Sequence, residues 1–286
     1  MSEPGEGALY VVATPIGNLD DLSARAVEVL GQVDLVAAED TRHSSRLLSH
    51  LGLQVSLMSL HDHNEAARVE KLREIVAAGQ QVALISDAGT PLISDPGYRV
   101  VRALRDAGLR VVPIPGPCAL VTALSAAGLP TDRFLFEGFL PARSGTRRNR
   151  LNALSGMTAT LVFYEAPHRI VALLEDIAAI FGEREVVVAR ELTKTFETFL
   201  VGSAFQLQQH MASDDNQTRG EFVVMVAPAP ERKHEEHASL EAEQLLMTLL
   251  DEGVGSKQAA AIASRLMGGR KGEWYQRVLT LREGSV

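Results

Sequence analysis

Strand-like and helix-like segments alternate along the first part of the chain, from Ala8 to about Gly116. Short apolar runs predict buried strands, and the stretches between them carry apolar residues at helical spacing. This alternation predicts βαβ units and therefore a parallel sheet with helices on both faces. The expected strands are 8–13, 34–38, 56–60, 82–85 and 110–114, and the expected helices are 22–33, 42–51, 64–78 and 98–107.

The longest turn of this region is the segment 86–97, between the expected strand 82–85 and the expected helix 98–107. Its prolines stiffen the backbone, while Gly89 and Gly97 allow a ligand to approach the main chain closely. About a dozen residues is more than a chain reversal needs. Since open α/β sheets bind ligands beyond the carboxyl ends of their strands, the segment is a candidate binding site. An ordinary surface loop is the alternative.

From Thr131 onward strand-like segments dominate, and only two or three helices fit between them. This pattern predicts a mixed, partly antiparallel sheet, joined to the first half by a helix over 118–127. The expected strands of this half are 134–136, 158–164, 185–189, 195–201 and 221–227.

The last part of the chain follows a polar, proline-containing stretch over 228–236. Three short helical segments, 240–250, 257–266 and 273–281, predict a module of the helix-turn-helix type. The sequence thus predicts an α/β protein with two α/β domains and a small C-terminal helical module, with bounds 1–117, 118–228 and 238–286.

Composition narrows the class of protein. The 286 residues, 46% of them hydrophobic, can form two cores, and a net charge of -8 argues against non-specific coating of nucleic acid, although not against a local basic patch. The single cysteine, Cys118, excludes a disulfide framework and a Cys-based zinc site. No signal peptide and no apolar run of membrane-spanning length is found, so we expect a cytoplasmic protein.

Glycine- and proline-containing turns follow several expected strands, whereas neither G-x-G-x-x-G after the first strand nor G-x-x-x-x-G-K-[ST] occurs. In a parallel sheet such turns meet along one edge and can face a common cleft. Simple strand capping is the alternative, but it does not explain the acidic residues beside the glycines. The turns are 14–18, 39–42, 86–97 and 115–119.

These turns, together with the segments 61–64 and 189–194, resemble the tetrapyrrole-methylase superfamily. Within it they are similar to the enzymes that methylate the ribose 2′-hydroxyl of a cytidine in the decoding centre of small-subunit (16S) ribosomal RNA. The likeness covers nearly the whole chain. It implies S-adenosylmethionine as the methyl donor, a donor site in the cleft between two α/β domains, and a homodimer.

The resemblance also implies which residues bind the donor. The helix N-terminus at Cys118 and Ala119 should suit the donor's carboxylate, because its N–H groups and partial positive charge attract anions. Tyr164 and Glu165 should close the opposite wall. The expected donor-binding residues are Pro15, Asp87, Ala88, Gly89, Ile93, Ser94, Asp95, Cys118, Ala119, Tyr164, Glu165, Arg190 and Leu192.

The implied reaction is an in-line displacement that aligns the ribose oxygen, the methyl carbon and the sulfur. A ribose hydroxyl is a poor nucleophile at neutral pH, so a proton acceptor or a cation that lowers its pKa is needed. Acids at loop ends also commonly accept backbone hydrogen bonds, and the sequence does not rank them. The expected acceptors are Glu39, Asp40, His61, Asp62 and Glu191, and the expected positioning cations are Arg42 and Lys194.

No metal ion is expected, because His61 and His63 lie two residues apart at a strand end and point to opposite faces. A nucleophilic role for Cys118 is also not expected. Its place at a helix N-terminus lowers a thiol pKa, but methyl transfer needs no covalent intermediate.

Two basic regions suggest contact with RNA. Four arginines within 143–150 can bind phosphates and stack on bases, with a solvated charged face as the alternative. In the tail, 257–282 carries six basic residues against one acid, and Trp274 and Tyr275 are available for stacking; a simple packing module is the alternative. The expected RNA-binding residues are Arg143, Arg147, Arg148 and Arg150.

Three functions remain open at this point. The leading hypothesis is methylation of small-subunit ribosomal RNA, naked or in the assembled subunit. Methylation of a small tetrapyrrole is the second, and the basic segments argue against it because a porphyrinoid precursor needs neither. The third is a non-catalytic, ribosome-associated binding module.

Overall fold

In a computed structural model the chain forms two compact units, one that extends to Ala229 and one that starts at Pro230. The structure describes residues 6–61, 64–214, 216–230 and 234–283. Within these residues, no helix combines the length and the apolar character needed to cross a membrane. The predicted boundary between 117 and 118 stays a prediction, since both sheets belong to the first unit.

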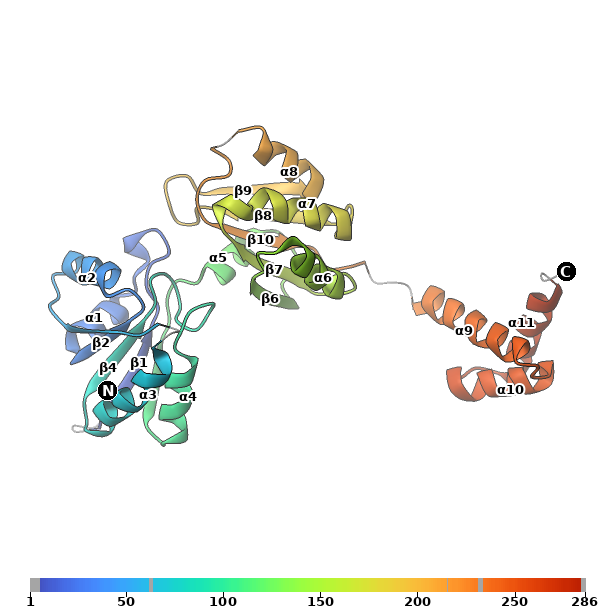
Figure 1. Cartoon of the computed structure of the whole chain (residues 1–286), viewed down its shortest axis with the longest axis horizontal. Coiled ribbons are helices and arrows are strands. Elements are labelled where there is room, and N and C mark those ends of the chain that lie inside the picture. Colours follow the sequence, from blue (N-terminus) through green and yellow to red (C-terminus); the bar gives the residue numbers. More distant parts are fainter. Residues whose placement is uncertain (1–5, 62–63, 215, 231–233, 284–286) are drawn as a thin grey trace. The chain divides into compact units, whose positions relative to one another are not determined.

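The first sheet is entirely parallel, in the order β3-β2-β4-β1-β5 (Figure 1). Apolar residues of α3 and α4, such as Leu72 and Leu104, cover one face, and Leu30 and Leu48 of α1 and α2 cover the other. The predicted parallel sheet is confirmed, with element ends shifted by one or two residues. Its elements are β1 (Ala8–Val12), α1 (Ala24–Gln32), β2 (Leu35–Ala38), α2 (Thr41–His50), β3 (Ser56–Ser59), α3 (Glu65–Ala77), β4 (Gln81–Ile85), α4 (Tyr98–Asp106) and β5 (Arg110–Ile114), with a short 3-10 turn at Leu19–Asp21.

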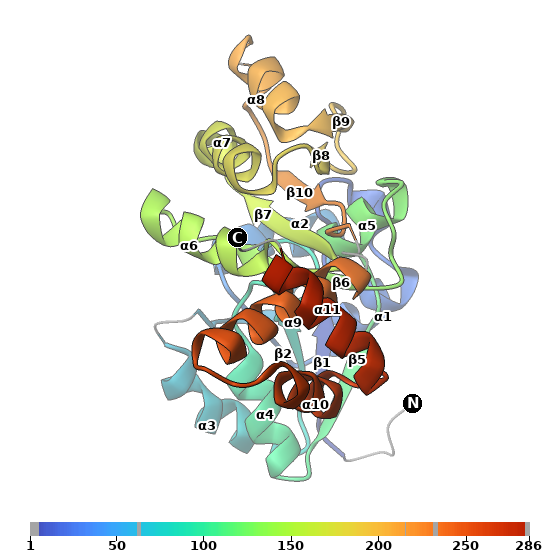
Figure 2. The same ribbon diagram turned by 90° about the vertical axis from the view of Figure 1, so that its right-hand side faces the viewer.

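The second sheet is mixed, in the order β6-β7-β10-β8-β9, with β6 parallel to β7 and the other pairs antiparallel. Helices α6, α7 and α8 pack on one face, and α5 packs on the other (Figure 2). The predicted mixed sheet is therefore confirmed. Its elements are α5 (Ala119–Ala126), β6 (Phe134–Phe139), α6 (Ser144–Leu154), β7 (Thr160–Glu165), a 3-10 turn (Pro167–Arg169), α7 (Ile170–Phe181), β8 (Glu185–Arg190), β9 (Thr198–Ser203), α8 (Ala204–Ala212) and β10 (Phe222–Val226).

The second unit contains α9 (His234–Asp251), α10 (Ser256–Met267) and α11 (Lys271–Glu283) around a core of its own. Trp274 belongs to this core: it is 8% exposed and its indole N–H donates to the Gly268 carbonyl at 2.7 Å. The expectation that Trp274 is available for stacking on a base is therefore wrong, because the residue holds the module together. The side chain of Arg282, one of the six basic residues counted in the tail, lies outside the described part of the structure, as do the linker residues 231–233.

Candidate functional site

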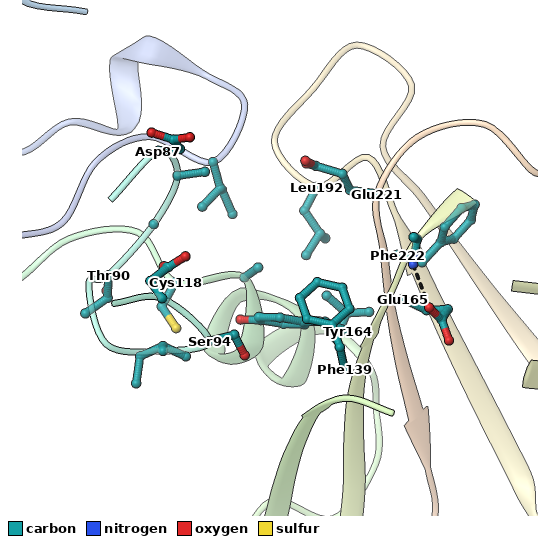
Figure 3. A pocket seen from close by; sticks show the side chains of 18 of the residues that line it. Asp87, Thr90, Ser94, Cys118, Phe139, Tyr164, Glu165, Leu192, Glu221 and Phe222 are labelled. Carbon is teal, nitrogen blue, oxygen red and sulfur yellow. Dashed lines mark hydrogen bonds between the residues drawn. The ribbon is translucent and has the colours of Figure 1, made fainter. Parts of the chain in front are cut away.

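A cavity of about 450 Å³ lies beyond the carboxyl ends of the strands of the first sheet. All four predicted turns contribute to its wall: Ile16 follows β1, Glu39 follows β2, residues 87–90 and 93–95 follow β4, and Cys118 and Ala119 follow β5. Residues of the second sheet, among them Tyr164, Leu192 and Val223, form the opposite wall (Figure 3). The expectation that the turns face one shared cleft is confirmed.

The loop after β4 is tied to neighbouring turns by its backbone. Thr14 and Gly89 exchange two backbone hydrogen bonds, at 2.9 and 3.0 Å, and form an isolated antiparallel bridge. The Thr14 hydroxyl donates to the Ser86 carbonyl at 3.1 Å, and the Thr90 hydroxyl donates to the Pro117 carbonyl at 2.9 Å. Because these bonds join the turns after β1, β4 and β5, the floor of the cavity is held in place without a ligand.

Gly97 does not serve the purpose expected for it. Its φ of 126° places it at the start of α4, where a Cβ would lie 2.8 Å from Leu84. Its N–H and that of Arg99 donate to the buried carboxylate of Glu65, at 3.1 and 2.9 Å. Gly97 therefore allows close packing and helix capping rather than ligand approach, whereas Gly89 does line the cavity.

Tyr164 connects the second sheet to the beginning of α5. Its hydroxyl accepts the N–H of Leu120 at 3.0 Å, and burial raises the pKa of the phenol. One of the N–H groups expected to be free for the donor's carboxylate is thus already satisfied. Cys118 and Ala119, just before it, remain in the cavity wall as expected.

Glu165 lines the cavity, and its carboxylate is buried and paired with Arg169. Side chains alternate along β7, so Tyr164 faces the cavity and Glu165 faces the helices on the other side, where its carboxylate lies 3.0 Å from the Arg169 guanidinium. Burial raises the pKa of Glu165, and its Oε2 atom has no hydrogen-bond partner. Glu165 thus lies in the cavity wall as expected, with its carboxylate engaged by Arg169.

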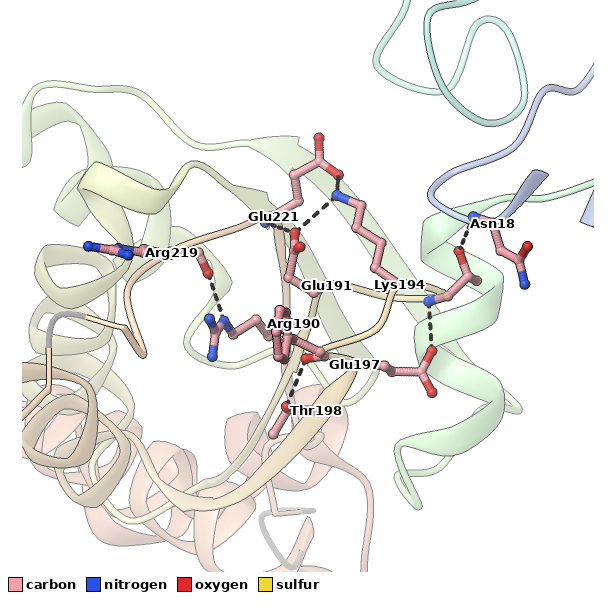
Figure 4. Close-up of polar contacts among 10 residues, drawn as sticks. Asn18, Arg190, Glu191, Lys194, Glu197, Thr198, Arg219 and Glu221 are labelled. Carbon is pink, nitrogen blue, oxygen red and sulfur yellow. Dashed lines mark hydrogen bonds and ion pairs between the residues drawn. The ribbon is translucent and has the colours of Figure 1, made fainter. Parts of the chain in front are cut away.

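The segment after β8 is strained and closely held (Figure 4). Glu191 and Thr193 have positive φ, of 50° and 64°. The Lys194 ammonium binds the carboxylates of Glu191 at 3.0 Å and Glu221 at 2.9 Å. Burial raises the pKa of Glu191, but its hydrogen bonds with Lys194 and the Glu221 N–H lower it by more, so Glu191 stays ionised and is a poor proton acceptor.

Two expected donor-binding residues lie outside the cavity wall. The Arg190 guanidinium donates to the carbonyls of Arg219 and Asn216, at 2.7 and 2.6 Å, and so holds the turn before β10. Pro15 is also not part of the wall. The remaining expected donor residues line the cavity: Asp87, Ala88, Gly89, Ile93, Ser94, Asp95, Cys118, Ala119, Tyr164, Glu165 and Leu192.

Of the expected catalytic residues that the structure describes, Glu39 alone lines the cavity. Asp40 instead begins α2: it accepts the Arg42 N–H at 2.8 Å and pairs with the Arg42 guanidinium, also at 2.8 Å. These hydrogen bonds lower the pKa of Asp40 to about 2. The arrangement of Asp40 and Arg42 therefore fits the capping role that was the alternative. His61 contacts Asn64, and Asp62 and His63 lie outside the described residues.

Several lining residues were not predicted from the sequence. Phe139 comes from β6, Ala166 and Pro167 follow β7, and Glu221 precedes β10, so long-range strand pairing brings them to the cavity. The residue pair Gly138-Phe139 was the one available signal, since a glycine inside a strand often marks a bulge. The complete set of missed residues is Ile16, Thr90, Phe139, Ala166, Pro167, Glu221, Phe222 and Val223.

The four predicted RNA-binding arginines lie on or immediately before the helix α6. Arg147 is only 4% exposed and binds Asp176 at 2.7 Å, together with the carbonyls of Ala142 and Ala172. The prediction of an RNA contact for Arg147 is therefore corrected, because a buried, paired guanidinium cannot reach a phosphate. Arg143 is exposed, and the half-exposed Arg148 and Arg150 pair with Asp176 and Glu137.

The part of the chain that the structure describes contains no cluster of side chains that could bind a metal ion. Nowhere among these residues do three or more His, Cys, Asp or Glu side chains group so that they could hold an ion. The cavity instead combines carboxylates, backbone groups and apolar side chains, a lining suited to an organic ligand.

Comparison with known proteins agrees with this geometry. Residues 8–208 match the family model described as Tetrapyrrole (Corrin/Porphyrin) Methylases, and residues 236–282 match the RsmI C-terminal HTH domain. Uroporphyrin-III-C-methyltransferase from Thermus thermophilus (TM-score 0.55, 23% identity, 77% of this chain and 94% of that chain) shares the fold. Diphthine synthase also shares it (TM-score 0.59, 17% identity, 77% and 90%).

Curated relatives match almost from end to end. Ribosomal RNA small subunit methyltransferase I of Pseudomonas aeruginosa is 54% identical over 96% of this chain and 97% of its own. The protein of the same name from Haemophilus influenzae is 50% identical over 94% and 95%. The chain therefore belongs to the tetrapyrrole methylase family, in the group of ribosomal RNA small subunit methyltransferase I.

Proposed function

We propose that this chain uses S-adenosylmethionine to methylate the ribose 2′-hydroxyl of a cytidine in the decoding centre of small-subunit (16S) ribosomal RNA. The observation that carries the proposal is the similarity, over nearly the full length, to curated methyltransferases of small-subunit ribosomal RNA. The location of that RNA also implies a cytoplasmic enzyme.

The cavity fits the proposed donor in size and chemistry. Its volume of about 450 Å³ falls in the range of roughly 300–1,000 Å³ typical of small-molecule sites. Backbone groups of 87–89 and the apolar side chains of Ile16 and Leu192 suit the nucleoside, and the carboxylate of Asp95 suits a positively charged ligand. When bound, the donor would supply an electrophilic methyl carbon on a sulfonium.

Within this proposal, Glu39 accepts the proton that the ribose hydroxyl loses as the oxygen–carbon bond forms and the carbon–sulfur bond breaks. Among the described members of the expected catalytic set, Glu39 is the one that lines the cavity. Lys194 and Glu191 take positioning roles, since they fix Glu221 at the cavity wall. The exposed Arg143 and the half-exposed Arg148 and Arg150 are proposed to bind RNA phosphates.

The test is a transfer assay with tritium-labelled donor and small subunits from a strain that lacks the enzyme. Label in the 2′-O-methyl group of the cytidine supports the proposal. Label that appears only in a porphyrinoid precursor, or in neither substrate, overturns it. Glu39→Gln should lower kcat at least tenfold with little change in donor affinity, whereas Glu28→Gln, on the outer surface of α1, should match the unchanged chain.

We also propose that the enzyme is a homodimer, as the resemblance implies. Exposed apolar residues on β9 and α8, Val201 and Phe205, are 59% and 54% exposed and offer contact area. Light scattering coupled to gel filtration should give twice the mass of 30.9 kDa. A monomer at micromolar concentration would contradict this part of the proposal only.

A further inference from the structure

Phe139 is an exposed aromatic residue at the cavity. It is 56% exposed, yet it lines the cavity, and its ring packs edge-on against Tyr164 with the centroids 5.7 Å apart (Figure 3). Exposing more than half of a phenylalanine in a folded chain forgoes the free energy that its burial would contribute. An aromatic side chain held at one edge and otherwise open to solvent is suited to stack on a flat ligand.

A β-bulge directs Phe139 to this place. The register of β6 and β7 shifts between Phe136 and Gly138, so Phe136 and Phe139, three positions apart, both pack against Tyr164. A regular strand would put these two residues on opposite faces. Gly138 makes the bulge possible with a φ of 64°, and a Cβ there would lie 3.0 Å from the Ser94 hydroxyl of the loop after β4. Bulges beside sites commonly re-aim a side chain in this way.

The chain beyond Phe139 leads directly to the basic helix. Arg143 is exposed immediately before α6, and Arg148 and Arg150, each about half exposed, follow on that helix. Glu137, within the bulge, binds Arg150 at 2.7 Å and so joins the helix to the strand that carries Phe139. One short stretch of sequence thus offers a flat apolar surface next to guanidinium groups, which is the combination that single-stranded RNA requires.

We propose that the target nucleobase of the RNA, turned out of its stack, lies on the ring of Phe139 and so brings its ribose to the cavity. This inference rests on the proposed function. The donor's adenine is the other flat ligand available, because Phe139 packs against Tyr164, one of the expected donor residues, and a separate measurement of donor affinity distinguishes the two. An enzyme that modifies one nucleotide of a folded RNA must hold that nucleotide outside the stack, and an aromatic platform does so without sequence-specific contacts.

The experiment compares Phe139→Ala, Phe139→Leu and Phe139→Tyr in methyl transfer to unmethylated small subunits, with donor affinity measured separately by calorimetry. Loss of one stacked base predicts that Phe139→Ala lowers kcat/KM for the subunit about tenfold or more. The donor Kd should change by less than about twofold. Phe139→Tyr, which keeps a flat ring, should retain most activity, and Phe139→Leu, which keeps apolar volume without the ring, should behave like Phe139→Ala.

The matched control is Phe134→Ala, because Phe134 is 47% exposed on the same strand but does not line the cavity. It should leave kcat/KM unchanged. Full activity of Phe139→Leu, or an equal loss of donor affinity in Phe139→Ala, would overturn the inference, and the latter would assign the ring to the donor. Absence of transfer by the unchanged chain would instead contradict the proposed function.

Discussion

The backbone N–H of Asn18 donates a hydrogen bond to the hydroxyl of Thr193 at 3.0 Å, across 175 positions of sequence (Figure 4). The bond joins the turn after β1 in the first sheet to the strained segment after β8 in the second. Gly17 lies against the same segment. Leu192, the residue before Thr193, lines the cavity. The contact thus ties the two walls of the cavity together at one point.

We expect Gly17→Ala to weaken donor binding. A Cβ at this position would lie 2.5 Å from Lys194, 2.8 Å from the Thr193 hydroxyl and 2.9 Å from the Leu192 carbonyl. The segment must move, and loss of the Asn18 hydrogen bond alone corresponds to about 1 kcal/mol, or close to a fivefold rise in donor Kd. Gly156→Ala is the control, because nothing lies within 4 Å of its added Cβ. Equal Kd values for both variants in calorimetry would refute the coupling.

Arg147→Met is predicted to destabilise the fold rather than to act through RNA. Removing this buried guanidinium breaks its 2.7 Å ion pair with Asp176. It also removes the hydrogen bonds that Arg147 donates to the carbonyls of Ala142 and Ala172. Breaking a buried pair costs about 3 kcal/mol. Arg148→Met, at a position 51% exposed, should cost far less. Urea unfolding measures both, and similar midpoints for the two variants would show that Arg147 has no structural role.

Tyr164→Phe tests the bond between the second sheet and α5. The substitution keeps the ring contacts with Phe136 and Phe139 but leaves the Leu120 N–H without its acceptor. An unpaired, partly buried donor costs about 1 kcal/mol or more, so thermal unfolding should move to lower temperature. Tyr98→Phe serves as the control, because Tyr98 is 68% exposed. A shift of the same size in both variants would argue against the capping role.

The pH dependence of stability should reveal the pairing of Asp40. Its pKa is lowered from 3.8 to about 2, chiefly by the Arg42 hydrogen bonds, so the folded state favours the ionised form. This contribution is fully present above pH 4 and is lost as the pH falls towards 2. In Asp40→Asn, which keeps a capping side chain, it is absent. The difference in free energy of unfolding between the two chains should therefore shrink below pH 4, and a constant difference would contradict the assignment.

The first sheet could be predicted from the sequence because its signals are local. Most of these strands are short apolar runs, and β1, β2, β4 and β5 are each followed by a glycine, proline or acidic turn that meets the others at one edge. Most of the residues that line the cavity could be predicted because they lie in the turns at that edge. The residues from the second sheet were harder to predict, because antiparallel pairing of β10 with β7 and β8 decides which of them reach the cavity.

Helix α6 shows why charge patterns mislead. Arg147, Leu151 and Leu154 occupy one stripe at helical spacing and are all buried, so an arginine takes a core position. Its charge is neutralised by Asp176 on α7, a partner 29 positions away that no local pattern indicates. The segment 143–150, rich in arginine and other polar residues, is therefore easily interpreted from sequence as fully exposed. Asp40 and Glu191 have the residue type of catalytic acids, but the hydrogen bonds that engage their carboxylates, including the one from the distant Glu221 N–H to Glu191, are visible only in three dimensions.

The paired backbone of Thr14 and Gly89 has a consequence for how the small ligand enters. Because hydrogen bonds already join these turns, binding of a ligand requires little ordering of the main chain. The entropy cost of binding then falls mainly on the ligand itself. Association of a small ligand with this cavity should then be fast and follow a single exponential.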